Sequence, residues 1–90
     1  MVDPSVSFNR WRAITPSDTV AIGETTAGDG LAKAPRAVYV GGAGNVVAVN
    51  DDGTTATFTG VAAGTVLPIM PKRINATSTT ATALVALYQV

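Results

Sequence analysis

The chain has 90 residues, with six basic and six acidic side chains, no net charge, and neither cysteine nor histidine. These numbers exclude a disulfide framework, the usual zinc, haem and iron–sulfur ligands, and any catalytic triad or acid–base pair that needs histidine. Six dispersed cations are also too few for a protein that binds nucleic acid by neutralising phosphates. We therefore expect no cofactor, no bound metal, no enzyme activity and no nucleic-acid partner.

The N-terminal 17 residues show no sustained hydrophobic period and are predicted to form an irregular arm, ahead of a single domain at 18–90. The arm carries Phe8, Arg10, Trp11 and Arg12. Because tryptophan and arginine are enriched at the energetic centres of protein interfaces, these four residues are predicted to bind a partner. The alternative is that Trp11 covers an open end of the core of its own subunit.

From residue 18 onward, short β-rich runs alternate with turn residues. Strands are expected at 19–22, 37–40, 45–50, 54–59, 65–69, 72–77 and 82–90. A loop at 24–35, rich in small and polar residues, separates the first two. Seven short strands with turns every 8–12 residues are typical of a small antiparallel β-sandwich or barrel. The predicted fold is therefore all-β.

The breaks between the strands are rich in glycine and aspartate. The predicted structural turn residues are Gly41, Gly42, Gly44, Asp52, Gly53, Gly60 and Gly64. The glycine-rich run at 41–45 lacks the helix and lysine of a phosphate-binding loop, and the run at 51–53 lacks the later ligands of a calcium loop. Carboxylates at Asp18, Glu24 and Asp29 could pair as a glycosidase dyad, but nothing in the sequence fixes their separation.

The composition predicts an oligomer. The chain is 47% hydrophobic and 13% charged, against about 25% charged residues in an average globular chain. A domain of this size without disulfides or metals often gains stability by association. The last strand is apolar on both faces, so it is either central and covered on both sides or packed against another subunit. Tyr39, Leu84 and Tyr88 are predicted subunit contacts.

A series of short motifs resembles the spike base protein family of the rhodobacterial gene transfer agent (GTA) and of related tailed phages and prophages. The resemblance covers about residues 14–88. It is carried by Arg36 to Val46 (RAVYVGGAGNV), Thr57 to Val61 (TFTGV), Ala63 to Thr65 (AGT), Leu67-Pro68, Arg73 to Thr77 (RINAT), Thr80 to Thr82 (TAT) and Val85 to Tyr88 (VALY).

This resemblance implies a small all-β virion protein without catalytic residues. It would form a homotrimeric base on the capsid surface and anchor a separate head spike or fibre, so its partners would be a capsid protein and a fibre protein. The sequence has no apolar run of 18 residues and no basic, then apolar, leader, so it is expected to fold in the bacterial cytoplasm, without inserting into a membrane, before it joins the virion. The alternative function is a carbohydrate-binding module that contacts the host surface directly.

Overall fold

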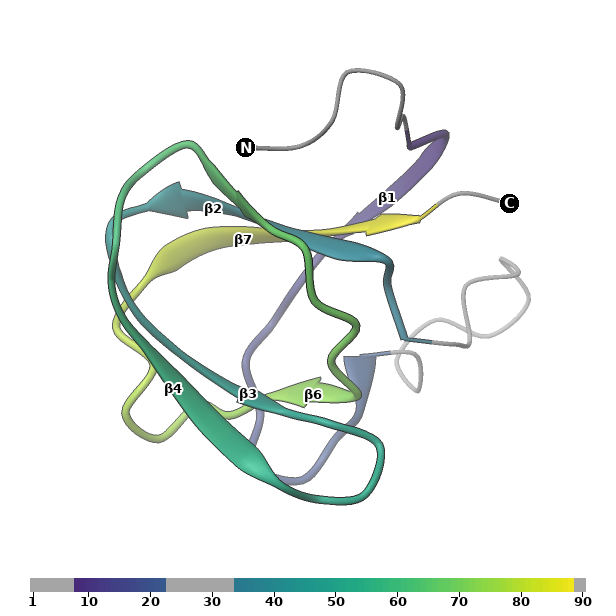
Figure 1. Cartoon of the computed structure of the whole chain (residues 1–90), viewed down its shortest axis with the longest axis vertical. Helices are drawn as coiled ribbons and strands as arrows, with labels where there is room; N and C mark the ends of the chain where they lie inside the picture. Colours follow the sequence, from purple (N-terminus) through teal and green to yellow (C-terminus); the bar gives the residue numbers. More distant parts are fainter. Residues whose placement is uncertain (1–7, 23–33, 89–90) are drawn as a thin grey trace.

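The computed structural model describes residues 8–22 and 34–88, and in these ranges the protein is an all-β sandwich of two antiparallel sheets (Figure 1). The strands are β1 (Arg10–Ala13), β2 (Ala37–Gly42), β3 (Gly44–Val49), β4 (Thr55–Val61), β5 (Thr65–Leu67), β6 (Arg73–Ile74) and β7 (Thr82–Tyr88). The larger sheet has the order β1-β7-β2-β5 and the smaller has the order β4-β3-β6. Among the described residues, no helix has the length and apolar character needed to cross a bilayer.

The predicted fold class is confirmed, and the strands differ from the expected ones mainly near the N-terminus. Residues 10–13, assigned to the irregular arm, form β1, which pairs with β7 from Arg10↔Tyr88 to Ala13↔Val85. Residues 19–22, expected to be a strand, instead begin with a turn in which the backbone N–H groups of Thr19 and Val20 donate to Ser17 Oγ. This side-chain acceptor offers the backbone an alternative to a strand ladder, which explains the difference.

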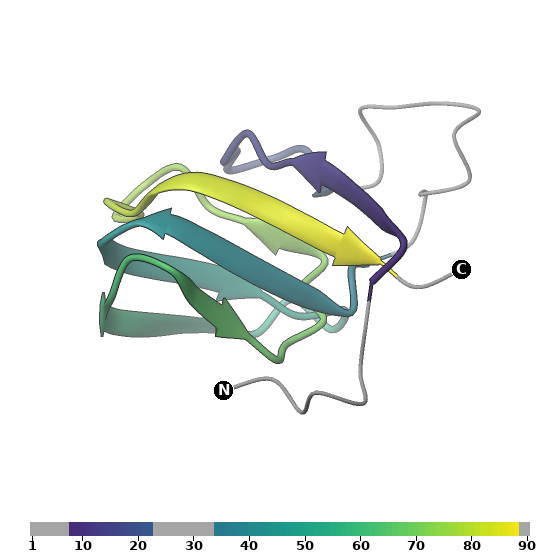
Figure 2. The ribbon, with the colours of Figure 1, turned by 90° about the horizontal axis from the view of Figure 1, so that it is seen from above.

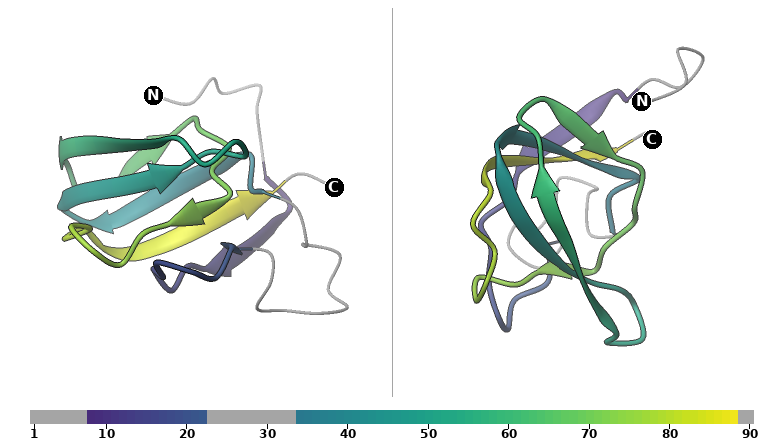
Figure 3. Two further views of the ribbon diagram at one scale, coloured as in Figure 1. Left: turned by 90° about the horizontal axis from the view of Figure 1, so that it is seen from below. Right: turned by 60° about the vertical axis from the view of Figure 1, so that its left-hand side comes forward.

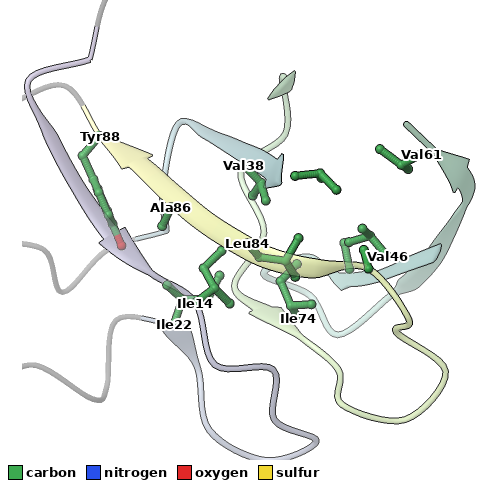
Figure 4. Packing of buried hydrophobic residues seen from close by; sticks show 12 residues of the cluster. Ile14, Ile22, Val38, Val46, Val61, Ile74, Leu84, Ala86 and Tyr88 are labelled. Carbon is green, nitrogen blue, oxygen red and sulfur yellow. The ribbon is translucent and has the colours of Figure 1, made fainter. Parts of the chain in front are cut away.

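The core lies between the sheets and is built from β-branched and other aliphatic side chains (Figure 4). Val38, Val40, Val46 and Ala86 are fully buried, and Ile74 is 1% exposed. No charged or polar residue is buried among the described residues. Buried and more exposed residues alternate along β7, and this pattern shows which side of the strand faces the core. Its even-numbered apolar residues point inward, and Val85 and Leu87 point to the other side.

The chain passes from the larger sheet to the smaller one through a single residue, Ala43, which separates β2 from β3. Gly41 and Gly42, expected in a turn, lie within β2, where an added Cβ would overlap Ala83 or Thr82 of β7. Tight packing against β7, rather than chain reversal, therefore explains these two glycines.

Asn45 connects the elements at this corner of the sandwich by hydrogen bonds. Its carbonyl oxygen accepts from the N–H groups of Thr80 and Ala81, at 2.9 and 3.1 Å. Its backbone N–H donates to Thr80 Oγ1, and its side-chain oxygen accepts from the N–H of Gly60. One asparagine thus connects β3 to β4 and to the residues before β7.

A second polar connection joins the 17–20 turn to the loop before β7. Asp18 accepts two hydrogen bonds from Thr77, one from its N–H at 3.0 Å and one from its hydroxyl at 2.6 Å. These bonds favour the ionised carboxylate. The Thr77 hydroxyl, followed by its N–H, therefore lowers the pKa of Asp18 from its ordinary value of 3.8.

This connection predicts an acid-dependent part of the stability. Because the pKa of Asp18 is lowered by folding, its stabilising effect is present above about pH 4 and is lost as the pH falls through the lower, folded-state value. Asp18→Asn is expected to lower the melting temperature at pH 7. Between pH 4 and pH 2, the melting temperature of this variant should fall less steeply than that of the wild type. Thermal unfolding monitored by circular dichroism checks this, with Asp51→Asn as the control in another exposed loop. Equal pH profiles for Asp18→Asn and the wild type would contradict the assignment.

Candidate interaction face

The larger sheet has one face toward the core and one away from it, and the second face is apolar throughout its centre. Strand register places Trp11 and Ala37 beside Leu87, and Ala13 and Tyr39 beside Val85. Tyr39 is also paired with Val66 of β5. Because paired residues in antiparallel strands point to the same side, these side chains share one surface. We call this surface the outer face, and it consists of Trp11, Ala13, Ala37, Tyr39, Val66, Val85 and Leu87.

The outer face is uncharged, and its exposure is concentrated at two aromatic residues. Trp11 is 66% exposed and Tyr39 is 37% exposed, whereas Ala37 is 2% exposed. The seven residues include no aspartate, glutamate, lysine or arginine. Figure 2 looks onto the outer face, with β1, β7, β2 and β5 side by side and the smaller sheet behind them. The face of an antiparallel sheet that points to solvent is normally polar, so an apolar one of this extent is typical of a surface that another protein covers.

The alternation of β1 splits the predicted partner-binding group Phe8, Arg10, Trp11 and Arg12. Trp11 lies on the outer face, whereas Arg10 and Arg12 are directed to the opposite side. Arg12 donates to the carbonyl oxygen of Ile22 at 2.9 Å, and its guanidinium lies 5.9 Å from the centre of the Tyr88 ring. Phe8 is half-buried just before β1. The exposure of Trp11 does not fit the alternative in which this side chain covers its own core.

The three predicted subunit contacts also lie on different surfaces. Tyr39 is part of the outer face. Leu84 and Tyr88 are 3% and 4% exposed and pack in the core of their own subunit. Their neighbours Val85 and Leu87 are the β7 residues that another chain can reach. The sequence shows that β7 is apolar on both sides, but it carries no signal for which side faces the core.

The predicted turn residues occupy three kinds of position. Asp52 and Gly53 form the β3–β4 turn, where Asp52 Oδ1 accepts from the N–H of Thr54 at 2.8 Å. The hydroxyl and N–H of Thr54 lower the pKa of Asp52. Gly64 lies in the turn between β4 and β5, Gly60 lies within β4, and Gly44 begins β3. Of the three carboxylates considered as a catalytic pair, Asp18 binds Thr77, and Glu24 and Asp29 lie outside the described residues.

The described part of the chain is thus a β-sandwich with an uncharged face, and it has no cluster of three acidic or other metal-ligating side chains. No family model matches the sequence, and no curated protein matches it. A solved structure described as "Capsid of native GTA particle computed with C5 symmetry" contains a similar chain. The two are 37% identical, with a TM-score of 0.75, over 97% of this chain and 90% of the other.

At this identity and coverage, the chain belongs to the same protein family as that component of the GTA capsid structure. It is a virion structural protein of the GTA and phage type.

Proposed function

We propose that this protein is the homotrimeric base that anchors a head spike or fibre to the capsid surface of a phage or gene transfer agent. The observation that carries the proposal is the uncharged outer face, which gives the subunit an apolar surface to bury against another chain. The similarity to a chain in a GTA capsid structure supports a place in the particle. The spike base role and the number of subunits are inferred from these two findings and from the sequence motifs at 36–46 and 73–77.

The size of the outer face favours a ring over a face-to-face pair. Four strands at about 4.8 Å spacing, over about five residues of 3.3 Å each, cover roughly 320 Å². A stable interface buries about 800 Å² on each partner, so two copies joined by this face alone would associate weakly. Around a threefold axis each subunit contacts two neighbours, and further surface is buried beside the face.

Light scattering coupled to size-exclusion chromatography tests the subunit number. A trimer has a mass of about 27 kDa, three times the 9.1 kDa of the chain. A mass of five chains would replace the trimer with a ring that matches the C5 symmetry used for the similar capsid. A chain that stays monomeric at high concentration, and that is incorporated nowhere in purified particles, would overturn the proposal.

Trp11→Ala separates a role in assembly from a role in folding. Because Trp11 is 66% exposed, its truncation is expected to change the free energy of unfolding by less than about 0.5 kcal/mol. Loss of a buried interface tryptophan typically costs about 2 kcal/mol of binding free energy. Chemical denaturation and concentration-dependent light scattering measure the two effects. Unfolding of the variant would assign Trp11 to the core instead.

Carbohydrate binding is the weaker candidate. Sugar hydroxyl groups need several hydrogen-bonding side chains around an aromatic platform, and the outer face offers only the indole N–H of Trp11 and the hydroxyl of Tyr39. A glycan array probed with the purified protein, without any fibre protein, would reveal this function as specific binding.

A further inference from the structure

Strand β4 has an open edge, and its regular part is Thr55 to Phe58, because the register against β3 shifts after Phe58. It is seven residues long and pairs only with β3, so among the described residues no strand lies on its other side (Figure 3). Its sequence, TATFTGV, contains no charged residue and no proline. Natural proteins usually protect such an edge with charges, proline, bulges or a short strand, because a free edge pairs readily with other chains.

The other edge strands of the sandwich carry this protection. β5 has three residues and is followed by Pro68, and β6 has two residues. β1 has four residues, of which Arg10 and Arg12 are charged. Only β4, among the described strands, combines length, neutrality and a free edge.

The hydrogen-bonding groups on the β4 edge can be assigned from the register. Phe58 and Ala56 are paired with Val46 and Ala48, and the next pair in this series is closed by the bond from the N–H of Asn50 to the carbonyl of Thr54. In an antiparallel pair, alternate residues direct their N–H and C=O groups to the partner strand and the residues between them direct theirs away. The N–H and C=O groups of Thr55 and Thr57 therefore point to the open side, whereas the register shift after Phe58 interrupts the alternation before Thr59.

The strand on the other side of β3 supports this assignment. The carbonyl groups of Val47 and Val49 accept from the N–H groups of Asn75 and Lys72, on the β6 side. Residues of odd number in β3 therefore direct their backbone groups away from β4. Thr57, which is opposite Val47, must direct its own groups away from β3 in the same way.

An apolar groove lies along the inner side of β4. It has a volume of about 200 Å³ and is lined by Ala48, Val49, Asn50, Thr54, Ala56, Phe58, Ile69, Met70 and Pro71. Met70, on the far side of the groove from β4, is 65% exposed. A strand added to the β4 edge would place every second side chain next to Ala56 and Phe58, above this groove.

We propose that the edge of β4 binds an extended segment of a different virion polypeptide, which adds to the smaller sheet as a new outer strand. Backbone groups of Thr55 and Thr57 hydrogen-bond to the segment, and the groove takes its alternate side chains, so the segment is uncharged and apolar at every second residue. This inference rests on the proposed role in the virion and on a base that is a ring of more than two subunits.

A second copy of the chain is a poor occupant of this edge. Pairing of β4 with β4 of another copy is twofold, so it closes at two subunits and builds no ring of three or five. The remaining described edges of the chain are short, charged or bounded by proline, and none offers a free neutral strand of matching length. The described part of the chain thus offers no strand for this edge, and we assign the segment to another protein of the particle.

Hydrogen exchange of single backbone amides tests the proposal with three samples: the dilute chain, its purified homo-oligomer and the assembled particle. In the first two, the amides of Thr55 and Thr57 are expected to exchange rapidly, while those of Ala56 and Phe58 are protected by β3. In the particle, the two threonine amides are expected to slow by roughly 100-fold. Rapid exchange of these amides in the particle would overturn the proposal, and protection already present in the homo-oligomer would assign the edge to a second copy. The subunit mass is measured separately, so a failed trimer is distinguishable from a failed edge.

Met70→Glu tests the groove. The side chain is exposed, so the variant is expected to fold and to form the same homo-oligomer, but a charge beside the groove should reduce the protection of Thr57 in the particle by at least about 10-fold. Val20→Glu, at an exposed residue that does not line the groove, is the matched control and should leave the protection unchanged. Full protection of Thr57 in particles that contain Met70→Glu would overturn the assignment of the groove to the incoming segment.

Discussion

Gly44→Ala is expected to destabilise the protein strongly. Among glycine-to-alanine substitutions outside the turns of the described residues, it should lower the free energy of unfolding most. An added Cβ at Gly44 would lie 2.5 Å from the backbone nitrogen of Ala81 and 2.7 Å from the carbonyl carbon of Thr80. These are backbone atoms, and both N–H groups of that segment are hydrogen-bonded to Asn45, so the segment cannot retreat without losing bonds. Overpacking of this kind typically costs up to about 3 kcal/mol of the free energy of unfolding.

Gly53→Ala is the control for this prediction. Gly53 has a positive φ of 91°, but its Cβ position is open space. The loss of free energy of unfolding therefore comes only from forcing alanine into a positive φ, which costs about 1 kcal/mol. Urea denaturation measures the free energy of unfolding of both variants, so that the two losses can be compared. A smaller loss for Gly44→Ala than for Gly53→Ala would show that the corner between the sheets can relax, and that its close packing is not what fixes the fold.

Tyr39→Glu is expected to abolish association of the subunits. Tyr39 lies in the middle of the outer face, between Val85 and Val66. Burial of a carboxylate without a partner typically costs several kcal/mol, so the dissociation constant should rise by at least about 100-fold. In the monomer the side chain is 37% exposed, and the variant should remain folded.

Val20→Glu is a matched control, because Val20 is equally exposed, at 37%, but lies outside the outer face. Light scattering should give the 9.1 kDa monomer for Tyr39→Glu and the wild-type mass for Val20→Glu. If Tyr39→Glu kept the wild-type mass, the outer face would not be the subunit contact, and the proposed base would need another surface for its assembly.

Much of the fold could be predicted because alternation and turn chemistry are local properties of the chain. The alternating run at 54–59 and the Asp52-Gly53 turn together specify the β3–β4 hairpin. The same reasoning misplaced the first strand. Residues 19–22 have the composition of a strand, but the Ser17 hydroxyl holds a turn there. Residues 10–13 look irregular, and they become a strand only because β7 offers them a partner.

The interaction surfaces were harder to predict, because they depend on which side of a strand the core occupies. Leu84 and Leu87 are alike in sequence terms, and only the packing of the second sheet separates the buried residue from the accessible one. The free edge of β4 is also invisible in the sequence. Its neutral threonines are typical of a solvent-facing strand, and the missing neighbour appears only when the order of the strands is known.

The link through Ala43 affects how the protein responds to force. The Cα atoms of Gly42 and Gly44 cannot separate by more than about 7 Å. The two sheets therefore cannot move apart at this corner. Tension applied to β4 by an attached chain passes through β3 and Ala43 into β2, and so to the sheet that bears the outer face. In the proposed spike base, a load on the spike would then reach the neighbouring subunits without first stretching a loop.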